Sequence, residues 1–421
     1  MKGWTFIAAL ACALSACAVD FFAPAPDAGA NYAADKVYPS GRLFPIAGYS
    51  SPSAKLLRTM GFSVAGPVYG GHEAMKKWAA EALTENFPVI WQFEVDYEGK
   101  PISMETLEEL AKAKKQLDLE QLKANARNRV AEAIAASNDN ILLWAIHPEE
   151  LRHWRPLEMT FLATVADEIR SADPKKRPVW MYQPGHYGYE SMAKYTSILD
   201  VIGQGFYPHA GASNRVWQRM WAENLMRAAK EANRPAIAVT EMYVQPKDEE
   251  LDMIPVWVHH DVWLSLIYGC EGILVFSFAT RKNFDAHGNY FFAYADVAQE
   301  LNGKPKLGEV LLFGVDEKDL SFTVTEGDKE AVYDNKYKKN DVHTYPTIVW
   351  RDMRHATGRY CFAVASSATP IKAELTGLPK VPVAVFDAAS GKQLGTTADG
   401  TFPLEFGPWG VKLLRFAPAN K

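Results

Sequence analysis

Two stretches of the chain end in glutamates whose placement suggests paired acid–base chemistry. Trp144-Ala-Ile-His-Pro-Glu149 and Pro235-Ala-Ile-Ala-Val-Thr-Glu241 are apolar runs bounded by turn residues, a pattern typical of strands buried on both faces. If both strands belong to one parallel barrel, the two acids open onto the face where such barrels have their active sites. Two converging carboxylates are the minimum equipment for hydrolysing a glycosidic bond. The alternative is that each acid only caps the following helix, but the pair favours the chemical interpretation.

The elements that must position these acids alternate along the chain. Strand-like runs are mostly followed by segments with helical periodicity, which predicts a parallel sheet, and eight such units match a (β/α)8 TIM barrel of roughly 250 residues. The predicted strands are Phe44–Tyr49, Phe62–Tyr69, Pro88–Phe93, Ile141–Ile146, Pro178–Tyr182, Val201–Phe206, Ala236–Thr240 and Gly272–Phe278, and the predicted helices are Glu73–Leu83, Met104–Ala136 (long enough for two), Leu157–Ile169, Val216–Ala232 and Ile254–Ile267.

The pattern changes past about Gly314, where short β-rich runs are separated by Gly, Pro, Asn or Asp. Such a run of strands without a helical period predicts a small all-β sandwich. We therefore expect an α/β catalytic barrel over 41–313 and a β-sandwich domain over 314–421. Packing of the sandwich against the barrel is the default role, and sugar binding is the alternative.

The N-terminus predicts export and a lipid anchor. Residues 1–16 have one Lys and a short apolar stretch, as in a cleaved signal peptide. Leu14-Ser15-Ala16-Cys17 resembles the bacterial lipobox, in which the cysteine is acylated; an ordinary signal peptide is the alternative. Ala18 after that cysteine favours the outer membrane, so we expect a lipid-anchored protein of the bacterial cell envelope. Residues 17–40, rich in Ala, Pro and Asp, are expected to be a tether.

Composition excludes several function classes. The chain has 45 basic and 50 acidic residues, with no basic run of five or more, so a nucleic-acid partner is not expected. After the signal segment no apolar run approaches the ~20 residues of a membrane helix. Cys270 and Cys361 lack metal-type spacing and are expected to be buried free thiols, with a disulfide left open. No zinc-protease motif occurs, and no metal or cofactor is expected.

Residues 44–313 resemble the retaining (β/α)8 glycoside hydrolases known as clan A. In that clan the acid/base glutamate ends strand four, often in Trp-x-x-x-Asn-Glu, and here Pro148 replaces the asparagine. The nucleophile ends strand seven, where Glu241 fits. Asp200-Val-Ile-Gly-Gln-Gly-Phe-Tyr207-Pro-His209 matches the clan's strand six, whose tyrosine hydrogen-bonds the nucleophile. Strand eight ends in an aromatic floor, here Phe276 or Phe278. The resemblance therefore implies two catalytic glutamates and assigns no single family.

The departure at Pro148 leaves two questions open. His147, His209 or Gln183 would have to replace the asparagine that binds the sugar 2-hydroxyl, and Glu150 competes with Glu149 for the acid role. A retaining glycosidase acting on a poly- or oligosaccharide is the favoured function, and a non-catalytic carbohydrate-binding lipoprotein is the alternative. The residues expected to contact the carbohydrate are Trp144, His147, Glu150, Tyr182, Gln183, Tyr207, His209, Tyr243 and Phe278.

Overall fold

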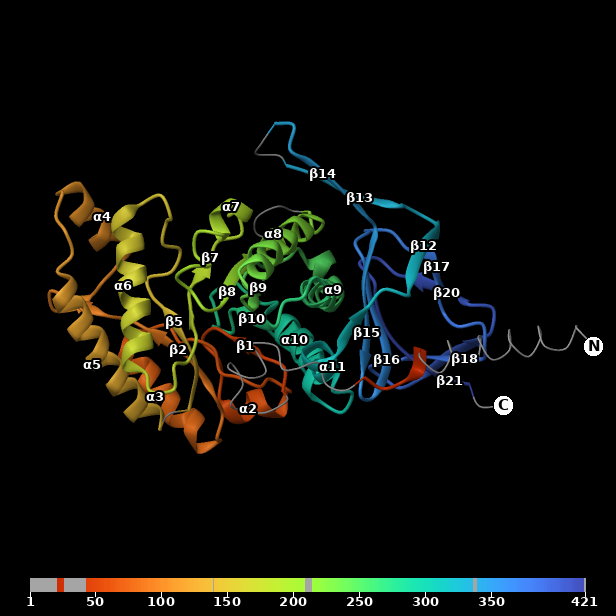
Figure 1. The fold of residues 1–421 in the computed structure, drawn as a ribbon, viewed down its shortest axis with the longest axis horizontal. Coiled ribbons are helices and arrows are strands. Elements are labelled where there is room, and N and C mark those ends of the chain that lie inside the picture. The colour runs from red at the N-terminus through yellow and green to blue at the C-terminus, as the bar shows by residue number, and fades with distance from the viewer. Residues whose placement is uncertain (1–20, 26–42, 139, 209–213, 336–338, 420–421) are drawn as a thin grey trace, which may run out of the picture.

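The computed structural model describes residues 21–25, 43–138, 140–208, 214–335 and 339–419 (Figure 1). The predicted signal peptide, Cys17 and His209 lie outside these residues. The chain forms a helix-rich N-terminal unit and a β-rich C-terminal unit, and the change falls between α11 (Leu307–Phe313) and β11 (Val315–Glu317).

The N-terminal unit is built on two parallel sheets, with strand orders β1-β10-β9-β8-β7 and β2-β5-β6. On one side only Met181 separates β6 from β7 in the chain. On the other side the N–H of Ser63 donates to the carbonyl of Ile46 at 3.2 Å, and that of Ala65 donates to Pro88 at 2.9 Å. The two sheets thus follow one another around a barrel. Its strands are β1 (Ile46–Gly48), β2 (Val89–Phe93), β5 (Ile141–Ile146), β6 (Val179–Trp180), β7 (Tyr182–Gln183), β8 (Ile202–Phe206), β9 (Ala236–Glu241) and β10 (Gly272–Phe276).

One predicted strand does not form as a regular element. The segment Phe62–Tyr69 makes a single parallel bridge, between Ala65 and Val89, in the place of the second barrel strand. Gly66 explains the close approach there, because a Cβ at this position would lie 2.1 Å from the carbonyl oxygen of Gly48. The prediction of a full strand is therefore wrong at this position, although the segment still joins β1 to β2.

Helices lie outside the strands, and their ends coincide with capping residues. The predicted helical stretch 104–136 is two helices, because Ser103 and Asp118 each accept a hydrogen bond from a backbone N–H three residues ahead, at Thr106 and Gln121. The sequence analysis did not predict α10 (His287–Asn302). The helices are α2 (Ala54–Thr59), α3 (Gly71–Thr84), α4 (Met104–Lys112), α5 (Leu119–Ser137), α6 (Pro156–Ala172), α7 (Tyr189–Met192), α8 (Trp217–Glu231), η3 (Asp248–Met253), α9 (Ile254–Tyr268), α10 and α11.

The C-terminal strands form two antiparallel sheets, ordered β11-β15-β16-β21-β18-β19 and β12-β17-β20. Alternate residues of both sheets enter one apolar core, for example Ala363 and Leu414 from the first and Leu375 and Leu404 from the second. This is the arrangement of a β-sandwich. Its strands are β11, β12 (Ser321–Glu326), β15 (Ile348–His355), β16 (Gly358–Ala365), β17 (Ile371–Thr376), β18 (Val383–Asp387), β19 (Gln393–Thr397), β20 (Thr401–Phe406) and β21 (Val411–Pro418).

Helix α9 joins the two units. It is apolar on all sides and almost wholly buried, as expected for a helix covered on both faces. Trp263 packs on Phe362 of β16 with ring centroids 5.0 Å apart, and the ring of His260 lies 3.2 Å from the hydroxyl of Ser366. The barrel and the sandwich therefore share an apolar interface.

Two segments extend the sandwich. A hairpin of β13 (Glu330–Asp334) and β14 (Val342–Pro346) projects from it (Figure 1). The hairpin reaches α8, where the ring of Tyr333 stacks on Trp217 with centroids 5.2 Å apart. Near the N-terminus, Phe21 is buried against the sandwich beside Phe416, and Arg359 lies over its ring. The expected tether is thus docked at residues 21–25, because its two phenylalanines supply apolar area that the Ala- and Pro-rich remainder lacks.

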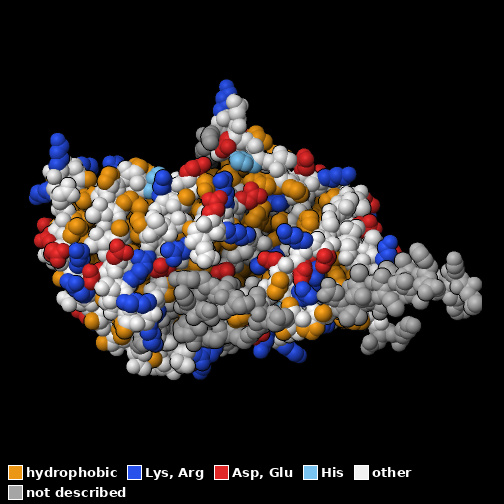
Figure 2. Space-filling model, viewed as in Figure 1, with side chains coloured by type: hydrophobic (Ala, Val, Ile, Leu, Met, Phe, Trp, Pro, Cys, Tyr) orange, Lys and Arg blue, Asp and Glu red, His pale blue; other side chains and the backbone are white. Residues whose placement is uncertain are grey.

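Charges of both signs are interspersed over the face shown in Figure 2, without a large area of one sign. No helix in the described ranges is long and apolar enough to cross a membrane. Cys270 and Cys361 are both buried and free, as expected, and burial raises the pKa of the Cys270 thiol to about 12.

Candidate active site

A buried tyrosine at the end of β1 reaches the first of the two glutamates. The Tyr49 hydroxyl donates a hydrogen bond of 2.8 Å to Oε1 of Glu149, which lies just after β5. Tyr49 is completely buried, and burial together with neighbouring Glu149 holds its pKa well above 10, so it remains a donor at any pH of interest. Because β1 and β5 belong to different sheets of the barrel, this hydrogen bond crosses the end of the barrel where the strands have their C-termini.

The Glu149 carboxyl is poised to be protonated near neutral pH. Desolvation raises its pKa from 4.5 to about 7, and the nearby Glu150 adds to this rise, while the hydrogen bond from Tyr49 lowers the pKa by stabilising the charged form. The side chain is only partly buried, so it is accessible to a ligand. A carboxyl with these properties can act as a general acid and, once deprotonated, as a general base.

Glu241 is the last residue of β9 and lies beside Phe276 of β10. The two are register partners in the parallel pair, and the backbone N–H of Met242 donates to the Phe276 carbonyl at 2.6 Å. Glu241 is 6% exposed, and its backbone carbonyl accepts a hydrogen bond of 2.8 Å from the Tyr294 hydroxyl. Its carboxylate contributes to raising the pKa of Tyr243 to about 12, behind the larger effect of burial.

Phe276 connects the surroundings of the two glutamates. Its ring centroid lies 5.4 Å from Tyr49, 5.8 Å from Tyr207 and 5.5 Å from Tyr243. Phe276, Tyr207 and Tyr243 are all partly exposed, and such rings present faces on which a sugar can stack. Of the two candidates for the predicted aromatic floor, Phe276 and not Phe278 lies among these partly exposed rings.

Glycines in β8 make room for two aromatic side chains of the neighbouring strands. A Cβ at Gly203 would lie 2.1 Å from Nε1 of Trp180, and one at Gly205 would lie 2.3 Å from the Tyr182 hydroxyl. Tyr182 in turn stacks on Tyr207 with centroids 6.2 Å apart. The Gly-Gln-Gly sequence therefore serves the packing of larger side chains from the neighbouring strands.

Two predicted contact residues flank Glu149. Glu150 is exposed, with a left-handed φ of 59°, and its N–H donates to the Tyr182 carbonyl at 3.2 Å. His147 is partly buried, and its Nδ1 is shielded from solvent with no hydrogen-bond partner among the described residues. Burial lowers the His147 pKa, with Glu94 opposing the shift, so the ring is neutral at pH 7. Both residues are close enough to Glu149 in the chain to line the same site.

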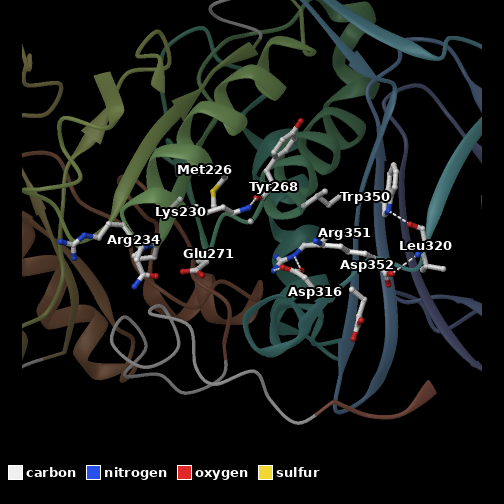
Figure 3. Close-up of a pocket in the computed structure, with 17 residues that line it drawn as sticks. Met226, Lys230, Arg234, Tyr268, Glu271, Asp316, Leu320, Trp350, Arg351 and Asp352 are labelled. Atoms are coloured by element: carbon white, nitrogen blue, oxygen red, sulfur yellow. Dashed lines mark hydrogen bonds and ion pairs between the residues drawn. The ribbon is translucent and has the colours of Figure 1, made fainter. Parts of the chain in front are cut away.

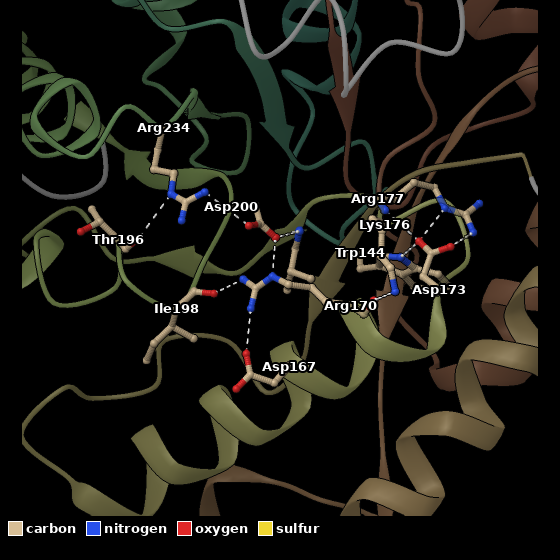
Figure 4. Close-up of polar contacts among 11 residues, drawn as sticks. Trp144, Asp167, Arg170, Asp173, Lys176, Arg177, Thr196, Ile198, Asp200 and Arg234 are labelled. Carbon is tan, nitrogen blue, oxygen red and sulfur yellow. Dashed lines mark hydrogen bonds and ion pairs between the residues drawn. The ribbon is translucent and has the colours of Figure 1, made fainter.

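Three predicted contact residues are in the wrong place. Trp144 is fully buried, and its indole N–H donates to Asp173 at 2.9 Å, a contact that also involves Arg177 (Figure 4). Gln183 is fully buried and accepts a hydrogen bond from the Gly203 N–H at 3.2 Å. Phe278 is 4% exposed and packs on Phe62 and Phe291. These errors arise because the strands are buried on both faces. An apolar run of this kind does not indicate to which face of the sheet a side chain points.

Asp200, at the start of the strand-six motif, is also structural. It forms ion pairs with Arg170 and Arg234 and accepts a hydrogen bond from the Val179 N–H at 3.0 Å (Figure 4). These partners lie at the N-terminal ends of the strands, opposite the glutamates. Tyr207, by contrast, lies among the aromatic residues near Phe276.

Sequence reasoning missed Tyr49, Tyr69 and Arg281. Tyr69 stacks on Tyr49 at 5.5 Å and is 40% exposed. Arg281 lies after β10; its Nη2 donates to Ser277 Oγ at 2.6 Å, and its guanidinium lies over Phe276 and Tyr243. Only their positions after the first, second and eighth strands gave a signal, because residues after barrel strands line the active end.

A large cleft lies elsewhere in the described part of the molecule. A cleft of about 570 Å³ separates the N-terminal ends of β9 and β10 from the sandwich, where Arg351 pairs with Asp316 (Figure 3). Burial raises the pKa of Glu271 in this cleft to about 7. Barrel enzymes place their chemistry at the C-terminal end of the strands, so we assign the candidate site to the glutamates there. Within the described residues, no group of three or more His, Cys, Asp or Glu is arranged to hold a metal ion.

The fold is similar to that of solved glycoside hydrolases. An α-amylase from Geobacillus thermoleovorans, complexed with acarbose, aligns with 90% of this chain and 99% of its own at 11% identity and a TM-score of 0.55. A GH27 β-L-arabinopyranosidase from Geobacillus stearothermophilus aligns over 90% and 98% at 11% identity and a TM-score of 0.51. The glycoside hydrolase family 30 subfamily 8 xylanase Xyn30A from Clostridium acetobutylicum aligns over 93% and 99% at 10% identity and 0.51.

No protein-family model and no curated protein sequence matches the chain. The structural neighbours nevertheless show the fold, which is similar to that of (β/α)8 glycoside hydrolases and agrees with the sequence resemblance. Because these neighbours come from several families, no single family is assigned.

Proposed function

We propose that this protein is a retaining glycoside hydrolase that acts on an oligo- or polysaccharide, with Glu149 as acid/base and Glu241 as nucleophile. The observation that supports this best is the Glu149 carboxyl, whose pKa of about 7 suits proton donation and which is bonded to Tyr49. Tyr49 contacts Phe276, the register partner of Glu241. The acarbose bound in the neighbouring α-amylase structure and the maltotriose bound in the AmyP structure agree with a sugar substrate.

In the proposed mechanism Glu149 protonates the leaving glycosidic oxygen while Glu241 attacks the anomeric carbon. The glycosyl–enzyme ester is then hydrolysed by a water that Glu149, now ionised, deprotonates. Retention requires the two carboxyls to lie about 5–5.5 Å apart when substrate is bound. The aromatic rings of Phe276, Tyr207 and Tyr243 would stack on the sugar during both steps.

The geometry favours Glu149 over Glu150 as the acid. Glu149 accepts the Tyr49 hydrogen bond, and burial raises its pKa to about 7. Burial also raises the pKa of Glu150, but Glu150 is exposed. For the missing asparagine contact, His147 is the preferred substitute, because its ring is neutral and its Nδ1 has no partner among the described residues. His209, the other histidine considered, lies outside those residues.

Activity on plant, algal and bacterial glycans tests the proposal. We expect wild type to release sugars, Glu241→Ala to be inactive on all substrates, and azide to restore part of its activity by filling the vacated space. Glu149→Ala should lose activity most on substrates with poor leaving groups. Glu150→Gln tests the competing candidate for the acid and should lose less activity than Glu149→Ala on these substrates.

Wild-type activity in both glutamate variants would contradict the assignment. Binding of glycans without any hydrolysis by wild type would favour the alternative, a carbohydrate-binding lipoprotein on a degenerate barrel.

We further propose that Cys17 is the lipid attachment point at the cell envelope. The docking of Phe21 on the sandwich agrees with this, since four residues span at most about 14 Å and would hold the sandwich close to the membrane. Cys17→Ser should release a folded protein from the membrane fraction. Mass spectrometry showing an unmodified cysteine at the mature N-terminus would contradict the proposal.

A further inference from the structure

Arg281 lies within the ring of residues that surrounds the two glutamates. Its guanidinium carbon is 5.4 Å from the ring centroid of Tyr243 and 5.5 Å from that of Phe276. Tyr243 is two residues after Glu241, and Phe276 is the register partner of Glu241. The Arg281 charge also lowers the pKa values of Tyr69 and Tyr243, against the larger raising effect of burial. The cation therefore faces the proposed sugar site.

This guanidinium has few partners for a residue so placed. Among the described residues, its hydrogen bond goes from Nη2 to Ser277 Oγ at 2.6 Å. The described part of the chain provides no carboxylate partner for it, and Nη1 is shielded from solvent without a hydrogen bond. Several other arginines of the barrel are paired with acids, for example Arg152 with Glu158 and Arg215 with Asp261. Burying part of a cation without a counter-ion is unfavourable. The position of Arg281 at the site therefore indicates that an anionic ligand binds there.

The chemistry of arginine points to the kind of anion. The guanidinium is planar and presents its N–H groups as a rigid fork that matches a carboxylate with two parallel hydrogen bonds. The neighbouring rings provide a flat apolar surface for a sugar ring, so a carboxylate attached to that ring would come within reach of the cation. Water competes poorly for such a contact because the aromatic rings exclude it from one side of the guanidinium.

We propose that the substrate is an acidic glycan and that Arg281 binds the carboxylate of a uronic acid unit lying over Phe276 and Tyr243. This inference rests on the proposed glycosidase function and specifies its substrate class. The hydrogen bond from Nη2 to Ser277 Oγ holds the guanidinium beside the rings, and Arg281 is thereby a specificity-determining residue.

The test compares acidic oligosaccharides with neutral partners of the same backbone. Tetramers of galacturonate and mannuronate and a glucuronoxylan oligosaccharide are each paired with the product of carboxyl reduction. We expect wild type to prefer one acidic member over its neutral partner by about 10- to 100-fold in kcat/KM, the range of a charged hydrogen-bonded pair. Arg281→Gln should bring this ratio close to one. Lys282→Gln, which removes the adjacent exposed charge, should leave the ratio unchanged.

Calorimetric binding to the Glu241→Gln variant separates failure of this inference from failure of the proposed function. Acid-selective binding that Arg281→Gln abolishes, without hydrolysis by wild type, would support the uronate site and contradict the glycosidase. Hydrolysis of neutral glycans with no preference for the acidic members would overturn the inference alone. A preference for sulfated galactan oligosaccharides, an unchanged ratio in Arg281→Gln, or no binding of any acidic member would also overturn it.

Discussion

Removing the Tyr49 hydroxyl should move the alkaline limb of the pH–rate profile upward. In wild type this hydroxyl donates to Glu149 and stabilises the carboxylate, which lowers the Glu149 pKa toward about 7 against the effect of burial. Tyr49→Phe keeps the ring and its packing on Phe276 but removes the donor. The carboxylate then loses a stabilising contact, so its pKa rises and the protonated, catalytically competent acid persists to higher pH.

The strength of the hydrogen bond sets the size of the shift. A hydrogen bond to a charged group contributes roughly 1.5–3 kcal/mol, and one pKa unit corresponds to about 1.36 kcal/mol, which gives an upper range of about 1–2 units. Glu149 is partly exposed, so water replaces some of the lost contact. We therefore expect the alkaline midpoint to move from about 7 to about 8.

The assay is kcat/KM from pH 4 to 10 on a substrate with a poor leaving group, because such substrates depend on the general acid. Tyr69→Phe is the matched control, since Tyr69 stacks on Tyr49 at 5.5 Å and its hydroxyl does not hydrogen-bond Glu149. That variant should keep the wild-type midpoint. A Tyr49→Phe profile with an unchanged or lower alkaline midpoint would refute the assignment of Glu149 as a Tyr49-tuned acid.

Three further variants test the structural reasoning. Burial raises the pKa of Glu149 from 4.5 to about 7, so between these pH values the native state holds a proton that the unfolded chain releases. The stability of the wild type therefore falls as pH rises from about 4.5 to about 7. In thermal unfolding, Glu149→Gln should be more stable than wild type by roughly 1–3 kcal/mol at pH 8, after discounting for partial exposure, and equally stable at pH 4. Trp144→Phe loses its indole hydrogen bond and should cost roughly 1–3 kcal/mol in urea unfolding with KM unchanged; an altered KM would return this residue to the site. Gly203→Ala places a Cβ 2.1 Å from Trp180 and should lower stability by roughly 1–3 kcal/mol, whereas Gly288→Ala, which meets nothing within 4 Å, should not.

The positions of the two glutamates could be predicted because they depend on simple patterns. Apolar runs ending at Ile146 and Thr240 predicted strands, and parallel barrel strands place the residues at their carboxyl ends on one face of the barrel. The structure has β5 and β9 at these runs. The helix α10 (His287–Asn302) was missed because the apolar Phe292 lies on its exposed face, at 59% exposure, and weakens the amphipathic period of the sequence.

Side-chain direction was the main limit for the site. Trp144 points to Asp173 and not to the site, and a run of six buried residues gives no alternation from which to read this. Tyr49 donates a hydrogen bond to Glu149, which is 100 positions away in the chain. Arg281 could be recognised as a site residue only from its contacts with the rings of Tyr243 and Phe276. Such long-range contacts have no local pattern in the sequence.

The central claim is that Glu241 forms a covalent bond to the sugar during turnover. The most direct test is mass spectrometry of peptides from enzyme inactivated by a 2-deoxy-2-fluoro glycosyl fluoride of the sugar that the glycan screen identifies. Such reagents slow the second step of a retaining mechanism, so the glycosyl–enzyme ester accumulates. We predict one sugar attached to the peptide that contains Glu241, and none in Glu241→Gln. A sugar attached to Glu149 or Glu150 would contradict the claim.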